Sequence, residues 1–184
     1  SGCPGAQLVI NGASFTGAVA SGITVGGTAV SSIVSNTGTV LTVVVNSGSG
    51  VVSVTSPNGT ATSSPSTYTV TALPATTVAS GGGTFCSSAT ITASNGNDGT
   101  MYFQGTTSGG TSTATPSASQ SVSTSGTYYF RAQSAGGCWG TEGSVAVVIQ
   151  TPASITTTPA SVCIGGSGTI AASSATSCVA TSST

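Results

Sequence analysis

Residues 39–55 of this 184-residue chain are TVLTVVVNSGSGVVSVT, and this stretch decides the fold class. Two runs rich in Val and Thr, Thr39–Val45 and Val51–Thr55, flank a short segment of Asn, Ser and Gly. Val and Thr favour the pleated backbone, and apolar and hydroxyl residues alternate here as they do in half-buried strands. The stretch therefore predicts two short β-strands joined by a turn.

The same pattern extends over most of the chain. Runs of this kind recur about every ten residues between Gly, Asn and Pro, and no apolar period of 3.6 residues is sustained, which is typical of β-sandwiches. The first half predicts strands at Gln7–Ile10, Gly22–Val25, Thr28–Ser35, Thr39–Val45, Val51–Thr55 and Thr67–Thr71. The second half predicts strands at Ala89–Ser94, Thr100–Gln104, Gln120–Thr124, Thr127–Gln133 and Ser144–Gln150.

Two breaks divide this pattern into parts. Leu73-Pro74-Ala75 interrupts it as a linker does, and Thr151-Pro152 interrupts it again. The sequence thus predicts an all-β chain of tandem immunoglobulin-like β-sandwiches, with modules over 1–72 and 76–150 and an additional carboxy-terminal strand segment over 151–184. That segment contains two expected strands, Ser154–Thr158 and Gly168–Ala172, but is too short for a core of its own. We expect it to be an incomplete third module or a donor-strand tail.

Charged side chains are almost absent from the sequence. Arg131, Asp98 and Glu142 are the only ones, and the chain holds no His. Catalysis normally uses His, carboxylates, Lys or an activated Cys, so we expect no enzyme activity, catalytic residue, cofactor or metal site. Without a basic patch we expect no nucleic-acid binding, and no apolar run approaches the roughly 20 residues of a membrane span.

The few chemically distinctive side chains have structural interpretations. Asp98 lies in a Gly-rich turn without the further carboxylates of a calcium loop, so a β-hairpin turn is expected there. Arg131 is expected to stack on an aromatic ring or to pair with Glu142. Trp139 is expected to cover the core or a disulfide, and stacking of a sugar on Trp139 is the alternative.

Five cysteines in so polar a chain indicate an oxidising, extracellular compartment. Cys86 and Cys138 flank the core of the second module and are the expected intramodule disulfide. Cys163 and Cys178 are expected to close a hairpin of the tail. Cys3 is then left over for an intermolecular bond, and a bond from Cys178 to Cys3 of the next copy is the alternative.

The sequence also contains candidate sites of modification. Asn58-Gly59-Thr60 fits the N-glycosylation triplet, so Asn58 is a candidate for glycosylation. The Ser- and Thr-rich stretches Thr60–Thr67 and Thr106–Thr115 are candidate carriers of O-linked glycans.

Three motifs in the first half follow the order found in IPT/TIG domains. They are QLVINGASFTG (Gln7–Gly17), ITVGGTAV (Ile23–Val30) and VSVTSPNGTA (Val52–Ala61). Over residues 1–71 the chain resembles these immunoglobulin-like modules, which also occur as tandem repeats in bacterial surface proteins. The family's modules begin with an additional strand before the turn that here contains Cys3-Pro4-Gly5. The resemblance therefore implies that the first strand is missing and that a sheet edge is open.

The second half is similar to the Ig-like repeats of giant secreted adhesins from Bacteroidetes-type bacteria. The residues that carry this resemblance are GGGTFC (Gly81–Cys86), SGTYYFRA (Ser125–Ala132) and GCWG (Gly137–Gly140). In the tail, TPASVCIGG (Thr158–Gly166) looks like the start of a third module of the same kind.

These resemblances imply a structural or adhesive protein at the cell surface. We expect a repeat of a bacterial surface adhesin, or a subunit of an extracellular filament in which a strand of one copy fills the open edge of the next. The expected partners are other copies of the chain or neighbouring repeats, and surface glycans. A fragment of a longer repeat protein is the alternative for the chain ends. A non-catalytic carbohydrate-binding module of a secreted enzyme is the alternative function.

Overall fold

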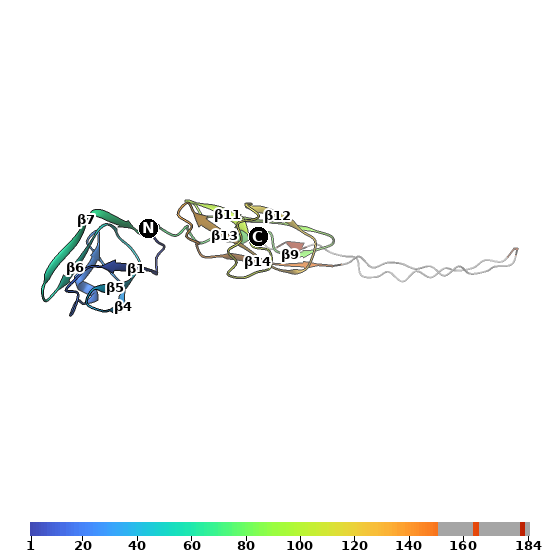
Figure 1. Cartoon of the computed structure of the whole chain (residues 1–184). Helices are drawn as coiled ribbons and strands as arrows, with labels where there is room; N and C mark the ends of the chain where they lie inside the picture. Colours follow the sequence, from blue (N-terminus) through green and yellow to red (C-terminus); the bar gives the residue numbers. More distant parts are fainter. Residues whose placement is uncertain (151–163, 166–180, 183–184) are drawn as a thin grey trace.

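The computed structural model describes residues 1–150, 164–165 and 181–182. Over these residues the chain forms β-strands and one short 3₁₀ turn, η1 (Ala20–Gly22). The strands build two immunoglobulin-like β-sandwiches that follow one another along the molecule (Figure 1). The all-β tandem fold predicted from the sequence is therefore confirmed.

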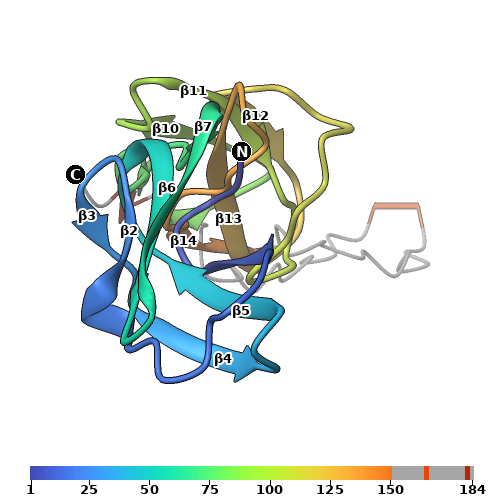
Figure 2. The same cartoon turned by 60° about the vertical axis from the view of Figure 1, so that its left-hand side comes forward.

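The first module contains two sheets that face each other. One sheet has the order β1-β5-β4 and the other has the order β3-β2-β6-β7 (Figure 2). The strands are β1 (Ala6–Asn11), β2 (Ile23–Val25), β3 (Thr28–Ala29), β4 (Ser32–Asn36), β5 (Val40–Val45), β6 (Ser49–Ser56) and β7 (Gly59–Thr69).

Alternation along β5 builds the centre of the first core. Leu41, Val43 and Val45 are at most 1% exposed, while the residues between them point to the other face of the sheet. Burying side chains of this size stabilises the fold by roughly 1.5–3 kcal/mol each. Phe15, from the loop after β1, and Val54, from β6, pack into the same cluster.

The second module has the same layered plan. Its sheets have the orders β12-β10-β8 and β11-β13-β14-β9-β15. The core gathers around Phe130, whose ring centre lies 5.2 Å from that of Phe103. The strands are β8 (Val78–Ser80), β9 (Gly83–Phe85), β10 (Ala89–Ser94), β11 (Gly99–Phe103), β12 (Ser119–Val122), β13 (Gly126–Ser134), β14 (Gly143–Ile149) and β15 (Thr181–Ser182).

The first strand of the second module is divided between its two sheets. β8 pairs antiparallel with β10, and β9 then pairs parallel with β14. Gly81 lies at the crossing with a φ of +87°, and a Cβ there would lie 2.5 Å from the carbonyl oxygen of Thr90, so the crossing requires glycine. β15 pairs antiparallel with the other side of β9. The crossing strand thus covers an edge of each sheet.

Several predicted elements differ from the structure. β8 and β9 lie where the sequence predicted no strand, β7 begins at Gly59 rather than at Thr67, and the strand predicted over Thr28–Ser35 is divided into β3 and β4. The expected hairpin at Asp98 is wrong, because this turn joins β10 to β11, which belong to different sheets.

Some expectations concern residues beyond the described part of the chain. The expected tail strands Ser154–Thr158 and Gly168–Ala172 lie outside the described residues. In the residues that the structure describes, no helix has the length and apolar character needed to span a membrane.

Candidate functional site

A groove runs along the first module between β1 and β7, the outer strands of its two sheets. Three hollows, of about 430, 140 and 140 Å³, follow one another and share lining residues. Leu8 of β1 and Tyr68 of β7 line the hollow at one end, and Ser14 and Asn58 line the hollow at the other end. We call this feature the β1–β7 groove.

The floor of the β1–β7 groove is apolar. Leu8, Ile10 and Tyr68 pack against the first core but stay only half-buried, and the more deeply buried Phe15 and Val52 continue the floor. No charged residue lines any of the three hollows. The groove therefore suits an uncharged occupant with apolar side chains on one face.

The edge of β1 directs main-chain groups into this groove. The Gly12 N–H donates to the carbonyl oxygen of Thr39 at 2.8 Å. By alternation, the main-chain N–H and C=O groups of the even-numbered residues of β1 point toward β5 and form the hydrogen bonds of that ladder. In an antiparallel ladder the residues between them turn their N–H and C=O groups outward, so those of Val9 and Asn11 face the groove. Within the described ranges, β1 pairs only with β5.

Among the described residues, the edge of β7 is occupied only at its end. Gly2 forms a parallel bridge with Val70, in which the Gly2 N–H donates to the Thr69 carbonyl oxygen (3.0 Å) and the Thr71 N–H donates to that of Gly2 (2.9 Å). By alternation, Thr67 is the next residue of β7 with outward main-chain groups. The groove begins where this bridge ends, beside Ser66, Thr67 and Tyr68.

The middle of β7 is irregular. The pairing register with β6 shifts between Val51 and Ser53, so that β7 bulges, and Pro65 lies in the bulge. The Ser63 hydroxyl accepts from the Val52 N–H (2.9 Å) and donates to the Ser66 carbonyl (2.6 Å). A proline without an N–H is tolerated on such an edge. The regular β1 edge is consequently the better template for an added strand.

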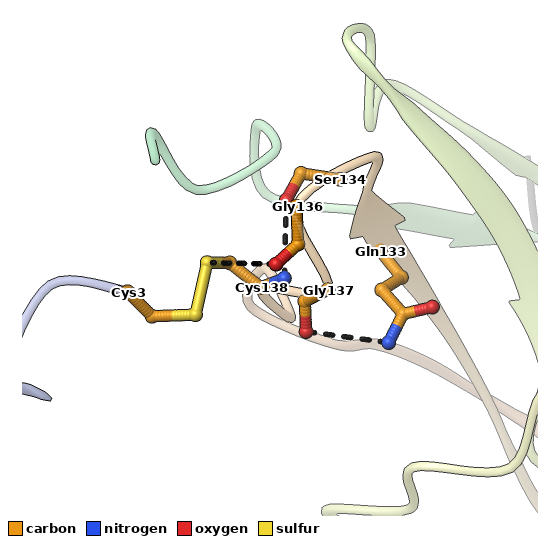
Figure 3. The surroundings of a disulfide bond; sticks show 6 residues. All are labelled: Cys3, Gln133, Ser134, Gly136, Gly137 and Cys138. Atoms are coloured by element: carbon orange, nitrogen blue, oxygen red, sulfur yellow. Dashed lines mark hydrogen bonds between the residues drawn. A yellow bond between two sulfur atoms is a disulfide. The ribbon is translucent and has the colours of Figure 1, made fainter. Parts of the chain in front are cut away.

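A disulfide between Cys3 and Cys138 joins the two modules (Figure 3). The Cα atoms are 5.5 Å apart, and Cys138 is 1% exposed. The Cys138 N–H donates to the Ser134 hydroxyl at 3.1 Å, which fixes the loop after β13. The buried Pro74 of the linker lies against the same end of the second module, within 2.9 Å of where a Cβ on Gly99 would be. In the described part of the chain, two covalent connections, the linker and the disulfide, therefore cross the junction.

This bond corrects the predicted cysteine pairing. Cys138 is bonded to Cys3 and not to Cys86, and Cys3 is not left over for a bond between copies, either alone or with Cys178. The pairing follows from module packing, because the loop after β13 turns toward the first module. Cys86 is also disulfide-bonded. The expected partners of the other predicted bond, Cys163 and Cys178, lie outside the described residues.

A separate hollow, of about 340 Å³, lies on the second module near the junction. The Arg131 guanidinium carbon is 5.6 Å from the centre of the Trp139 ring, and the Tyr102 ring meets Trp139 edge-on at 5.5 Å. Arg131 Nε donates to the Gly140 carbonyl oxygen at 2.6 Å. The expected stacking of Arg131 on an aromatic ring is confirmed, and Trp139 is half-buried beside the disulfide.

Glu142 binds the loop that borders this hollow. Its Oε1 accepts from the Ser108 hydroxyl (2.7 Å) and its Oε2 from the Gly109 N–H (2.6 Å). The buried Gln104 side chain holds the same loop through two bonds of 2.9 Å with the main chain of Ser112. Both carboxylate oxygens are thus used within the chain, and the part of the chain that the structure describes contains no ion pair between Glu142 and Arg131.

The remaining predicted site residue is Asn58. It is exposed in the turn between β6 and β7, and it lines the far end of the β1–β7 groove. Glycosylation there stays a prediction. Across the described residues, no group of three or more His, Cys, Asp or Glu side chains lies close enough together to hold a metal ion.

No protein-family model and no curated protein matches the chain. Among solved structures it is similar to SGBP-B of the Bacteroides ovatus mixed-linkage glucan utilization locus, solved with a mixed-linkage heptasaccharide (14% identity, TM-score 0.29, 84% of this chain and 44% of that chain). It is also similar to the fibronectin(III)-like modules of Clostridium thermocellum CbhA (14% identity, TM-score 0.36, 82% of this chain and 90% of that chain). The chain spans less than half the length of the first of these. Both likenesses concern the β-sandwich fold alone.

Proposed function

We propose that this chain is a non-enzymatic extracellular structural protein that assembles head to tail, with a strand from another polypeptide completing the first module. The observation that carries this proposal is the β1–β7 groove, an apolar floor between two strand edges. An added strand would bond to the outward main-chain groups of Val9 and Asn11 and would place alternate side chains on the floor. The main-chain groups of the β1 edge would then have hydrogen-bond partners, and the apolar floor would be covered.

Cysteine and charge support an extracellular, self-associating protein. All three cysteines in the described ranges are disulfide-bonded, which fits an oxidising compartment. Only 2% of the residues are charged, so copies meet little electrostatic repulsion as they approach. A contact between a groove on one copy and a strand on another is heterologous, and it propagates into a filament unless a ring closes.

The test uses two exposed valines at opposite edges of one sheet. Val9 lies on the groove edge of β1 and is 55% exposed, whereas Val34 lies at a bulge of β4 and is 51% exposed. Val9→Pro removes an outward N–H without touching the bonds to β5, and Val34→Pro is the matched control. Unreduced wild-type protein and Val34→Pro are expected to form regular filaments in electron micrographs. Val9→Pro is expected to stay dispersed, with an unchanged β-sheet circular dichroism spectrum.

Two results would contradict this proposal. The first is a wild-type protein that stays monomeric under all non-denaturing conditions. The second is Val9→Pro filaments as abundant as those of Val34→Pro, which would show that assembly does not use the groove.

The hollow at Trp139 favours a second candidate function, a carbohydrate-binding module. Its aromatic ring and the 46%-exposed Leu73 could receive the apolar face of a sugar. Against this, Arg131 and Glu142 already bond within the chain, which leaves fewer polar groups for a ligand. Binding on a glycan array that is lost in Trp139→Ala and kept in Val9→Pro would support the candidate, and an array without any binding would exclude those glycans.

A further inference from the structure

We infer that the strand that fills the β1–β7 groove comes from residues 151–180 of a second copy. We further infer that it runs parallel to β7 and antiparallel to β1, with its carboxyl end toward Ser1. This inference rests on the proposed function and specifies the occupant and its direction.

The direction follows from the bridge at Gly2. Gly2 forms a parallel bridge with Val70. A strand that lies on the amino side of Gly2 and keeps the same direction would next form hydrogen bonds with the outward main-chain groups of Thr67. From there its path leads directly into the hollow of about 430 Å³, the largest of the three in the groove. From one hollow to the next, the lining residues move forward along β1 and its following loop and backward along β7, so β1 and β7 run in opposite directions along the groove. A strand parallel to β7 is therefore antiparallel to β1.

The second module shows the same arrangement already filled. There β9 runs parallel to the end of β14, as Gly2 does beside Val70 of the first module. β8 runs antiparallel to the last residues of β10. The strand of the first module that corresponds to β10 is β1. Only the counterpart of β8 is absent from the first module as described. The occupant would take that place, beside Val9 and Asn11.

The position of the segment supports residues 151–180 as the occupant. Gln150 donates to the carbonyl oxygen of Phe85 on one side of β9, and Thr181 pairs with Thr84 on the other side. β14 runs from its start near the Cys138 loop to Ile149, so Gln150, the last described residue before the segment, lies at the end of the second module opposite the first module. Because Gln150 and Thr181 both lie beside β9, the contour length of the thirty residues between them allows a reach of about 50 Å from β9, which is longer than the eleven-residue β7.

The chemistry of the segment matches that of the groove. Residues 151–180 contain no charged side chain, and small and hydroxyl residues separate Ile155, Val162, Ile164 and Ile170. Ile164 is fully exposed in the single chain. The groove floor of Leu8 and Ile10 is an apolar surface that side chains of this kind could cover. The segment follows the second module in the sequence, whereas the groove lies on the first module. A second copy is therefore the chain whose groove the segment would fill.

The test is site-specific photo-crosslinking in the full-length chain. A benzophenone-bearing amino acid replaces Val9, Ala13 or, as the control on the opposite edge, Val34 in separate variants. Each variant is mixed with an equal amount of heavy-nitrogen-labelled protein without the probe, assembled, irradiated and analysed by mass spectrometry. The isotopes separate crosslinks between copies from those within one copy.

The expected crosslinks from Val9 and Ala13 join residues 151–180 of the labelled copy, and Val34 gives none. Because the strand is antiparallel to β1, the Ala13 probe should attach about four residues earlier in the segment than the Val9 probe. The reverse order would overturn the direction. Filaments whose crosslinks join the neighbouring copy outside residues 151–180 would overturn the occupant and leave the proposed function standing. Crosslinks that lie within one copy would overturn both, because the strand would then not come from another polypeptide. Absence of filaments in the same samples would overturn both.

Discussion

The two modules share a fold plan and differ along one side. In the second module, β8 and β9 cover the edges of β10 and β14, whereas in the described part of the first module only Gly2 covers a short part of β7. Burial follows this difference. Ile91 and Phe130 are 0% exposed, while Ile10 of the first module remains half-buried. The eight residues Val78–Phe85 thus cover sheet edges of the second module that stay open in the described part of the first module.

The largest effect is expected from giving the first module a strand of its own. A copy of Val78–Phe85 added before Ser1 would enter the groove in the inferred direction and compete with any strand from another copy. We expect filaments to disappear in electron micrographs and the melting temperature of the first module to rise. A Gly-Ser extension of equal length is the control. If the melting temperature rises but filaments still form, groove filling and assembly are independent.

The junction offers the next largest effect. Cys3→Ser combined with Cys138→Ser removes a crosslink that spans 135 positions, worth about 5 kcal/mol in the chain-entropy model. Since the modules have separate cores, we expect calorimetry to show two transitions, with the first module melting at a lower temperature. A single unshifted transition would mean that non-covalent packing at Pro74 already couples the modules.

A paired substitution compares the two cores directly. Ile91→Ala should lower the free energy of unfolding by about 2–5 kcal/mol, because the side chain is fully buried. Ile10→Ala should cost less in dispersed protein, because water already reaches that side chain. In filaments, the Ile10→Ala cost should approach that of Ile91→Ala if a strand covers it. Denaturant titrations of dispersed and assembled protein measure both, and an Ile10→Ala cost that is equal in the two states would contradict groove filling.

The smallest effect is expected at the second module's loop. Glu142→Gln keeps the shape but weakens the acceptors for Ser108 and Gly109, at a cost of about 1 kcal/mol. Calorimetry should place this loss in the second module, while filaments form as in wild type. Loss of filaments would implicate the Trp139 hollow in assembly and weaken the assignment to the groove.

Alternation in the sequence predicted the strands that bury one face. β10 (Ala89–Ser94) coincides with its prediction, and β5, β13 and β14 lie within a residue of theirs. β8 and β9 were missed because each has three residues, too few to show a period of two, and glycines separate them. They are strands because neighbouring edges pair with them, which is tertiary information.

The candidate site was predicted in part. The resemblance at Gln7–Gly17 implied a missing first strand, and the groove lies beside that strand, β1. The disulfide was not predictable in the same way. Pairing Cys86 with Cys138 assumed a bond inside one module, but Cys3 reaches Cys138 because Gly2 is held at Val70, beside the linker to the second module.

The Cys3–Cys138 bond also determines how the chain responds to tension. Force that enters near the amino end and leaves at Gln150 crosses the sulfur atoms and bypasses the 135 positions between the two cysteines. Fully extended, that bypassed length is about 450 Å, and it cannot be drawn out while the bond is intact. In a fibre of such subunits, this length would not contribute to extension in oxidising surroundings. A reductant would release this stored length and make the same fibre stretch before it breaks.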